Sequence, residues 1–247
     1  MSKLVAAMAG AVVVVACGGG ASSAPPATTA SPHNGVTPAP RCDPADLATC
    51  DRACASGDIA VCAQLGALYA TAEGELADLR DVPRAARYLE QACAADELPS
   101  CYLLAWSLDV GTELGPDPAR AATLYQRACA GALAEACGAL GTLYEDGRGV
   151  PKDEARAAEL YRIPCDRGSV GYCNNLGRMY KYGRGVPRDL GRARALFEHG
   201  CAAADLLACN NLGVLYEQGI GVAIDYVRAR ALYVQACEGG EDRKSVV

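Results

Sequence analysis

The stretch that decides the fold is Cys137-Gly-Ala-Leu-Gly-Thr-Leu-Tyr-Glu-Asp-Gly-Arg-Gly-Val-Pro-Lys-Asp-Glu-Ala-Arg-Ala-Ala-Glu-Leu-Tyr-Arg-Ile-Pro-Cys165, because its pattern recurs along the chain. Close copies occupy residues 173–201 and 209–237, a looser copy occupies 101–129, and a copy three residues longer occupies 62–93. A period of this size indicates stacked supersecondary units, since each unit is too small to bury its apolar face alone. The sequence therefore predicts an array of five repeats.

Each copy is predicted to form two helices joined by a turn. In the copy that begins at Cys173, Leu176, Met179 and Tyr180 are spaced three and four residues apart, which places them on one helix face. Gly183-Arg-Gly-Val-Pro187 then interrupts the pattern. An aspartate recurs where the second helix is expected to start, so that its carboxylate can accept hydrogen bonds from backbone amides; it stands at positions 81, 117, 153, 189 and 225.

Small residues recur at fixed places in both predicted helices. A residue without a Cβ atom, or with only a methyl group, lets two helices approach closely. We expect this role for Gly141, Gly177, Gly213, Ala157, Ala193 and Ala229. The predicted fold is therefore all-α, a right-handed α/α solenoid of helix-turn-helix repeats with a period of 36 residues.

Cysteines mark the junctions between copies. On one continuous helix a separation of eight residues corresponds to about 12 Å of rise, whereas a disulfide needs Cα atoms within about 7 Å. The chain must therefore turn between such cysteines, and we predict six disulfides that staple the end of one helix to the start of the next. The predicted pairs, each eight residues apart, are Cys42–Cys50, Cys54–Cys62, Cys93–Cys101, Cys129–Cys137, Cys165–Cys173 and Cys201–Cys209.

Two other roles for the cysteines, as zinc ligands and as free thiols in the core, are disfavoured. Zinc sites gather cysteines in fours, but these pairs are spread one to a repeat. Free thiols buried in a core are disfavoured because the N-terminus predicts export to an oxidising compartment. The 14 cysteines of the chain, without metal-type C-x-x-C spacing, instead indicate an oxidising compartment.

The end of the sequence departs from the pattern. The eight-residue rule calls for a cysteine at position 245, where Ser245 stands, so the rule predicts that Cys237 is unpaired. Residues 242–247 can also be back-translated, stop codon included, into a common sequencing-adapter sequence. We therefore expect a non-native tail at 242–247 and a natural chain that continues; a genuine terminus with one free thiol is the alternative.

The N-terminus predicts export. Lys3 precedes an apolar run from Leu4 to Ala16, which is shorter than the roughly 20 residues that span a membrane. The small Ala16 before Cys17 resembles the lipobox of bacterial lipoproteins, in which the cysteine becomes the acylated first residue of the mature protein. Residues 1–16 are thus expected to be a lipoprotein signal peptide; the alternative is an ordinary cleaved signal.

Three further segments complete the predicted organisation. Residues 17–40, rich in Gly, Pro, Ala, Ser and Thr, lack any periodicity and are expected to be a flexible tether. Residues 41–61 are expected to form an N-terminal capping helix segment, and residues 62–241 to form the five repeats.

The repeat pattern resembles the Sel1-like repeat, a relative of the tetratricopeptide repeat. The resemblance is carried by Leu-Gly-x-Leu-Tyr-x-x-Gly-x-Gly-Val and by the Asp, Arg-Ala and Leu-Tyr that follow, and it covers about residues 54–237. The eight-spaced cysteines make the chain similar to the Helicobacter cysteine-rich protein family. One copy departs from the pattern, with Ala105 in place of the Gly, Leu108 in place of the Tyr and Trp106 in its apolar face.

The predicted function is a lipid-anchored scaffold of the cell envelope that binds a protein or peptide. Curved arrays of this kind bind extended partners on their concave side. Repeated asparagines at the start of the first helix, which are candidates for peptide contacts or for local capping of turns, are Asn174, Asn175, Asn210 and Asn211. The formal net charge of -6, without a basic stripe, disfavours nucleic acid as a partner, and the acylated Cys17 would supply the membrane contact.

The resemblance also implies an alternative function, since members of the cysteine-rich family are described as β-lactam-binding or β-lactam-hydrolysing proteins. Serine enzymes of that class use S-x-x-K and K-T-G, and neither pattern occurs in the sequence. Tyr172-Cys173-Asn174 matches Y-x-N by letter only. His33 and His199 are the only histidines, so a histidine-rich zinc site cannot form, and we predict no catalytic, cofactor-binding or metal-binding residue.

Overall fold

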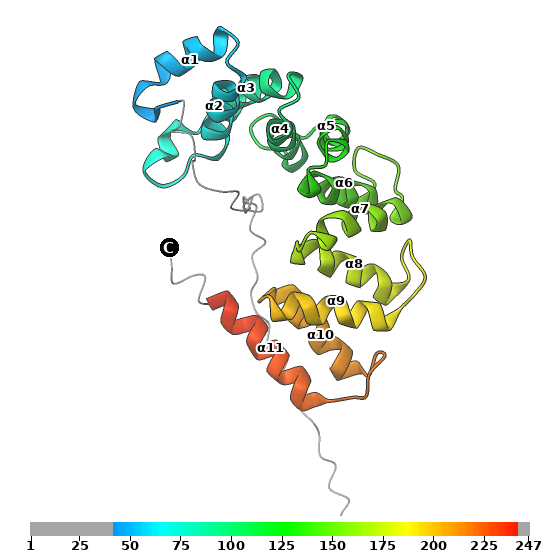
Figure 1. Cartoon of the computed structure of the whole chain (residues 1–247). Helices are drawn as coiled ribbons and strands as arrows, with labels where there is room; N and C mark the ends of the chain where they lie inside the picture. The colour runs from blue at the N-terminus through cyan, green and yellow to red at the C-terminus, as the bar shows by residue number, and fades with distance from the viewer. Residues whose placement is uncertain (1–41, 242–247) are drawn as a thin grey trace, which may run out of the picture.

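The computed structural model describes residues 42–241, except the side chains of residues 75 and 238–241. The predicted signal peptide 1–16, the lipidation site Cys17, the tether 17–40 and the tail 242–247 lie outside the described residues. Within them the fold is all-α, as predicted. The helices follow one another along an arc, with α1 at one end and α11 at the other (Figure 1).

The described residues form eleven α-helices and two short 3-10 helices. Successive first helices of a pair, from α4 onward, begin 36 residues apart, which confirms the predicted period. The pairs are α2/α3, α4/α5, α6/α7, α8/α9 and α10/α11, and the elements are η1 (Pro44–Asp46), α1 (Leu47–Ala55), α2 (Ile59–Thr71), η2 (Gly74–Leu79), α3 (Val82–Ala94), α4 (Leu98–Val110), α5 (Pro118–Ala130), α6 (Ala134–Asp146), α7 (Glu154–Asp166), α8 (Val170–Tyr182), α9 (Leu190–Ala202), α10 (Leu206–Gln218) and α11 (Tyr226–Glu241).

The recurring aspartate caps the second helix of every pair, which confirms its predicted role. Asp189, for example, accepts a hydrogen bond of 2.9 Å from the backbone amide of Arg192. Its own amide donates to the carbonyl of Tyr180 at the end of α8. The same two contacts recur at positions 81, 117, 153 and 225, although the second acceptor is Leu108 in one repeat. Each turn is therefore held at both of its ends.

The helices of a pair touch where the sequence places glycine in the first helix. A Cβ atom added to Gly177 in α8 would lie 2.7 Å from the ring of Phe197 in α9, and one on Gly213 would lie 2.7 Å from the ring of Tyr233 in α11. Alanines 157, 193 and 229 on the second helices are buried. The prediction that these small residues permit close packing is confirmed.

Four disulfides join the second helix of one pair to the first helix of the next. Cys54–Cys62 joins α1 to α2, and Cys42–Cys50 ties the segment before η1 to α1. All six predicted pairs are bonded, with Cα atoms 4.5 to 5.3 Å apart. In every pair except Cys42–Cys50, the enclosed turn reverses the chain through a residue with positive φ at the same repeat position; these residues are Gly57, Asp96, Ala132, Gly168 and Ala204. Left-handed backbone at this position lets two helices meet end to end in an antiparallel arrangement.

The prediction that Cys237 is unpaired is wrong. Cys237 is itself disulfide-bonded in the structure, whereas the eight-residue rule predicted an unpaired thiol. The rule considers only the next cysteine along the chain. A disulfide, however, requires that two Cα atoms come close in space and does not require a fixed separation in sequence.

The Gly-x-Gly turns of the last three pairs, at Gly149, Gly185 and Gly221, pack on the preceding repeat. Gly185 has φ +65°, and a Cβ atom there would overlap the backbone of Glu154 and Ala155 at the start of α7. Only glycine combines this left-handed conformation with so close an approach. The second Gly of the Gly-x-Gly turn therefore sets the distance between neighbouring repeats.

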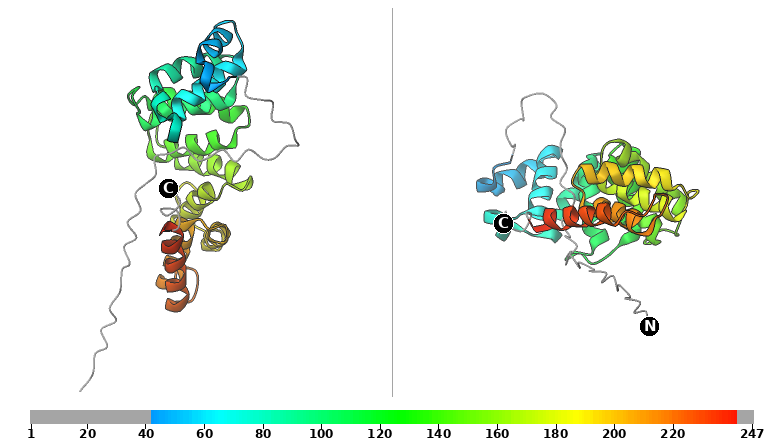
Figure 2. Two further views of the ribbon diagram at one scale, coloured as in Figure 1. Left: turned by 90° about the vertical axis from the view of Figure 1, so that its left-hand side faces the viewer. Right: turned by 90° about the horizontal axis from the view of Figure 1, so that it is seen from below.

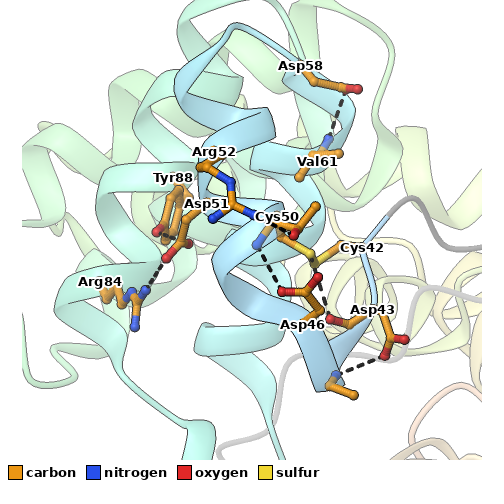
Figure 3. Close-up of a disulfide and its surroundings, with 12 residues drawn as sticks. Cys42, Asp43, Asp46, Cys50, Asp51, Arg52, Asp58, Val61, Arg84 and Tyr88 are labelled. Carbon is orange, nitrogen blue, oxygen red and sulfur yellow. Dashed lines mark hydrogen bonds and ion pairs between the residues drawn. A yellow bond between two sulfur atoms is a disulfide. The ribbon is translucent and has the colours of Figure 1, made fainter.

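Helix α1 covers the N-terminal end of the array. Asp51 of α1 accepts hydrogen bonds from the guanidinium of Arg84 (2.6 Å) and the hydroxyl of Tyr88 (2.5 Å), both on α3 (Figure 3). The Cys54–Cys62 disulfide ties α1 to α2. Seen from two further directions, the stack again runs from α1 to α11 (Figure 2).

Two glycines of α8 provide a matched test of helix packing. Gly177→Ala should lower the free energy of unfolding by about 1–3 kcal/mol, because the new methyl group meets the Phe197 ring. Gly171→Ala, where no atom lies within 4 Å of the added Cβ, should raise it by about 0.5 kcal/mol through helix propensity. Urea unfolding followed by circular dichroism measures both, and equal effects would contradict the packing role.

Candidate binding surface

The first helices of neighbouring pairs contact one another directly. A Cβ atom on Gly138 of α6 would overlap the ring of Tyr172 on α8. Asn211 of α10 donates a 2.8 Å hydrogen bond to the side-chain oxygen of Asn174 on α8. Second helices are instead bridged by long charged side chains, as in the 2.6 Å ion pair between Arg120 and Glu90. Because short contacts join the first helices and long ones join the second, the first helices lie on the inner side of the bend.

A row of accessible residues follows one face of each of the first helices α4, α6, α8 and α10. The spacing within a helix is four, three and four residues, which keeps the row on one face. We call this surface the inner stripe; its members are Pro99, Leu103, Trp106 and Val110 on α4, Glu135, Ala139, Thr142 and Asp146 on α6, Gly171, Asn175, Arg178 and Tyr182 on α8, and Leu207, Asn211, Val214 and Gln218 on α10. All are exposed or half-buried.

The character of the inner stripe changes from helix to helix. On α4 it is apolar and includes Trp106, and on α6 it carries two carboxylates. On α8 it includes Arg178 and Tyr182. Tyr182 is 60% exposed, and the centroid of its ring lies 5.1 Å from the Lys181 ammonium. A surface of this kind can distinguish partners by the order of their apolar and charged groups.

The four asparagines predicted as candidate peptide contacts have different environments in the structure. Asn174 is only 3% exposed and accepts the hydrogen bond from Asn211, so its amide joins two repeats. Asn175 and Asn211 lie in the inner stripe, half-buried. Asn210 is exposed because α10 is the last first helix of the described array and nothing packs on it there.

A buried carboxylate beneath the inner stripe connects two repeats. Glu145 of α6 lies 2.8 Å from the guanidinium of Arg184, in the turn after α8, and 3.7 Å from that of Arg178. Its other oxygen accepts a 2.8 Å hydrogen bond from the Tyr161 hydroxyl on α7. The Glu145 side chain is 10% exposed, so these partners are needed to offset its loss of hydration.

The same arrangement occurs one repeat earlier. Asp109 of α4 pairs with Arg148, which holds the place of Arg184 in the preceding turn. Burial raises the pKa of Asp109, while the facing Arg148 guanidinium opposes that rise. We call an acid at the end of a first helix together with the arginine of the next turn the acid–arginine latch.

The following repeat replaces both members of the latch and also the tyrosine that contacts the acid. Lys181 stands where Glu145 and Asp109 stand, Phe197 replaces the tyrosine, and Ile220 replaces the arginine of the next turn. Lys181 is 5% exposed and its ammonium lies over the ring of Tyr182. The three positions change together, which is expected if the acid and the arginine depend on each other. Sequence reasoning missed the latch because its members stand about 40 residues apart and belong to different repeats.

Tyrosines line the contacts within and between the helix pairs: Tyr102 on α4 faces Tyr125 on α5, and Tyr161 on α7 stacks on Tyr172 of the next repeat. Burial raises the pKa of Tyr102 to about 12 and raises the pKa values of Tyr125, Tyr161 and Tyr172 as well. A raised folded-state pKa means that the neutral hydroxyl contributes stability below pH of about 10, and this stability is lost as the pH rises further. These groups therefore hold the array together in the neutral range.

The residues that matched β-lactamase letters have packing roles. Cys173 is in a disulfide, Asn174 is bonded to Asn211, and Tyr172 stacks on Tyr161 with ring centroids 5.9 Å apart. His199 lies in the last turn of α9, and His33 lies outside the described residues. Residues 42–241 contain no group of three His, Cys, Asp or Glu side chains that could hold a metal ion.

The geometry defines a class of protein, an α-solenoid of disulfide-linked helix pairs. The sequence matches the Sel1 repeat five times, at residues 59–97, 98–132, 134–169, 172–205 and 206–241. The chain therefore belongs to the Sel1 repeat family. No curated protein matches the sequence.

The sequence is similar to chains of solved structures. The Sel1 repeat protein from Oxalobacter formigenes superposes with a TM-score of 0.68 at 24% identity, over 74% of this chain and 72% of that one. A protective antigen of uropathogenic Escherichia coli strains has a TM-score of 0.49 at 24% identity, over 78% of this chain and 49% of that one. Helicobacter pylori cysteine-rich protein B has a TM-score of 0.42 at 27% identity, over 53% of this chain and 93% of that one.

The acid–arginine latch can be tested by substitution. Arg184→Ile should lower the free energy of unfolding by about 1–3 kcal/mol, since it leaves the buried Glu145 carboxylate with the neutral Tyr161 hydroxyl and only the more distant guanidinium of Arg178. The triple variant Glu145→Lys/Tyr161→Phe/Arg184→Ile reproduces the combination found one repeat later and should lose less than the single variant. Denaturant unfolding measures both values.

Arg156→Ile is the control, because its ion pair with Glu159 is exposed on both sides and should contribute less than about 0.5 kcal/mol. A triple variant that is less stable than Arg184→Ile would show that the three positions do not act together.

Proposed function

We propose that the chain is an exported scaffold whose inner stripe binds a protein or peptide of the cell envelope. The observation that carries this proposal is the distribution of exposed apolar side chains. Among the described residues, nine large apolar residues are exposed, and Val110, Tyr182 and Leu207 of these lie in the inner stripe. Four more gather at the α11 end, at positions 224, 226, 227 and 234.

The contrast between buried and exposed positions supports a binding role. Buried positions of the first helices keep the same residues from repeat to repeat, as Leu140, Leu176 and Leu212 do. The inner stripe instead changes between apolar, acidic and cationic from one helix to the next. A scaffold needs a constant core for stacking and a variable surface for recognition.

The disulfides indicate an oxidising, extracytoplasmic location. Within residues 42–241 no helix is long and apolar enough to cross a membrane. Attachment to the membrane is proposed through an acyl group on Cys17, because Ala16-Cys17 after the apolar N-terminal run resembles a lipobox.

Partner capture tests the inner stripe. The array, immobilised in its oxidised form, should retain a protein or peptide from an envelope extract, and Val110→Ala/Tyr182→Ala/Leu207→Ala should reduce that retention at least about tenfold, which corresponds to about 1.4 kcal/mol. The three side chains are 48%, 60% and 66% exposed, so the variant should fold. Leu76→Ala/Ile163→Ala, at exposed positions outside the inner stripe, is the matched control, and equal retention by all three proteins would refute the assignment.

Metabolic labelling tests the anchor. In a bacterial host that processes lipoproteins, the full chain should incorporate labelled palmitate and partition into the membrane fraction, because acyl chains contribute about 0.8 kcal/mol for each buried methylene. Cys17→Ala should abolish both. Label that persists in Cys17→Ala, or absence of label in the unaltered protein, would contradict lipidation at this residue.

A further inference from the structure

Helix α8 and the turn that follows it differ in charge from the equivalent segments of the other repeats. Residues 170–188 contain four cationic side chains and no acidic one. The equivalent segments around α4, α6 and α10, which are residues 98–116, 134–152 and 206–224, each contain more acidic than cationic side chains. One part of the array is therefore positive in a chain whose formal net charge is -6.

Lys181, in the last turn of α8, is buried without a polar partner. Its side chain is 5% exposed, and its ammonium lies 5.1 Å from the centroid of the Tyr182 ring. Within residues 42–241 this ammonium forms neither a hydrogen bond nor an ion pair. Because burial of an unpaired ammonium is costly, Lys181 favours an anionic partner at this place.

The neighbouring repeats satisfy the same position internally. Glu145 in α6 and Glu217 in α10 stand where Lys181 stands in α8, and each accepts a 2.8 Å hydrogen bond from a tyrosine hydroxyl of its second helix. In α9 that tyrosine is replaced by Phe197, which has no polar side-chain atom. Among the described repeats, the exchange of a hydrogen-bonded carboxylate for an unpaired ammonium is confined to the α8/α9 pair.

Arg184 brings a second donor to the same ring. Its guanidinium carbon lies 5.9 Å from the centroid of the Tyr182 ring. One of its terminal nitrogens pairs with Glu145 at 2.8 Å, but its Nε–H group is buried and has no acceptor among the described residues. Tyr182 is 60% exposed in the inner stripe, so the two donors lie where the stripe is accessible. We call Lys181, Tyr182 and Arg184 the cation–tyrosine site.

We propose that the cation–tyrosine site binds the side-chain carboxylate of an aspartate or glutamate in the peptide partner. The inference rests on the proposed function, because the carboxylate belongs to a segment that lies along the inner stripe. Lys181 and Arg184 donate hydrogen bonds to it beside the Tyr182 ring. Hydrogen bonds between charged groups are about twice as strong as neutral ones, so this contact fixes the register of the peptide on the array.

A peptide carboxylate fits this position better than other anions do. Helix α8 lies on the inner side of the bend (Figure 1), which an extended chain can reach and a flat membrane surface cannot. Glu145 and Asp146 on the neighbouring helix would repel a polyanion. Outside the described residues, the segment 1–41 contains no Asp or Glu and the segment 242–247 contains only Asp242, so Asp242 is the internal acid that the experiment must test.

Peptide selection on the full, oxidised chain tests the preference for an acid. Random peptides displayed on phage should become enriched in Asp or Glu, and selection on Lys181→Met should lose this enrichment. Lys152→Met is the matched control and should keep it, because this variant removes the same charge from a side chain that is 58% exposed in the turn after α6.

Affinities of a selected peptide, labelled with fluorescein, measure the contact itself. Replacement of its acid by the corresponding amide should weaken binding to the unaltered chain at least about tenfold. On Lys181→Met the two peptides should bind within about twofold of each other. Lys181→Glu/Phe197→Tyr/Ile220→Arg, which installs the combination found around Glu145, should lose the preference for the acid in the same way.

Urea unfolding without peptide separates a binding role from a structural one. Lys181→Met should raise the unfolding midpoint, because it removes a buried charge that has no acceptor. A lysine that only stabilises the C-terminal end of α8 would instead make the midpoint fall, which would overturn the proposal. A fall in the midpoint caused by Asp242→Asn, and absent in the Lys181→Met background, would also overturn it, because the occupant would then be the chain itself.

The selection distinguishes failure of this inference from failure of the proposed function. Enriched peptides without acids, or equal acid enrichment on Lys181→Met, would refute the carboxylate site and leave the proposed function standing. Absence of any enriched peptide would refute both. Binding of vesicles that contain anionic phospholipid to the unaltered chain but not to Lys181→Met, without enrichment of acidic peptides, would assign the site to a lipid headgroup and overturn the proposal.

Discussion

The structure depends on one constraint: no repeat can bury its apolar face by itself. Each first helix packs on its own second helix on one side and on the preceding second helix on the other. Close contacts make this double burial possible, such as Gly177 against Phe197 within a pair and Gly185 against the backbone of Glu154 between pairs. Stability is then approximately a sum over neighbouring interfaces. A helix at the end of an array lacks one of its two neighbours, so part of its apolar face stays exposed unless another segment covers it.

The chain meets this constraint differently at its two ends. At the N-terminal end α1 covers α2, and Asp51 fixes α1 to α3 through Arg84 and Tyr88. At the α11 end of the described residues, Tyr226 and Val227 are largely exposed. The asymmetry follows from the direction of the repeat, because a first helix needs a helix before it and a second helix needs one after it.

Covalent and electrostatic links have different parts in the assembly. The disulfides close each reversal between pairs, where Asp96, Ala132 and Ala204 adopt left-handed backbone conformations that non-glycine residues disfavour. The acid–arginine latches act across repeats and are built from charges that are mostly hidden from water, so their value lies in fixing how one repeat sits on the next. Apart from Arg178 and Asp146, which contact latch residues, the inner stripe takes part in neither task, so its residues can vary.

The sequence by itself determined the period, the helix pairs, the aspartate caps and the pairing of cysteines eight residues apart, because each of these is a local signal repeated five times. It also suggested the inner asparagines, but it could not separate buried Asn174 from accessible Asn175, since burial depends on the helix that arrives from the next repeat. The partners of Glu145 and the exposure of Tyr226 and Val227 were decided only by the tertiary structure. These features join residues that are distant along the chain, and only the stacking of one repeat on another brings them together or leaves them uncovered.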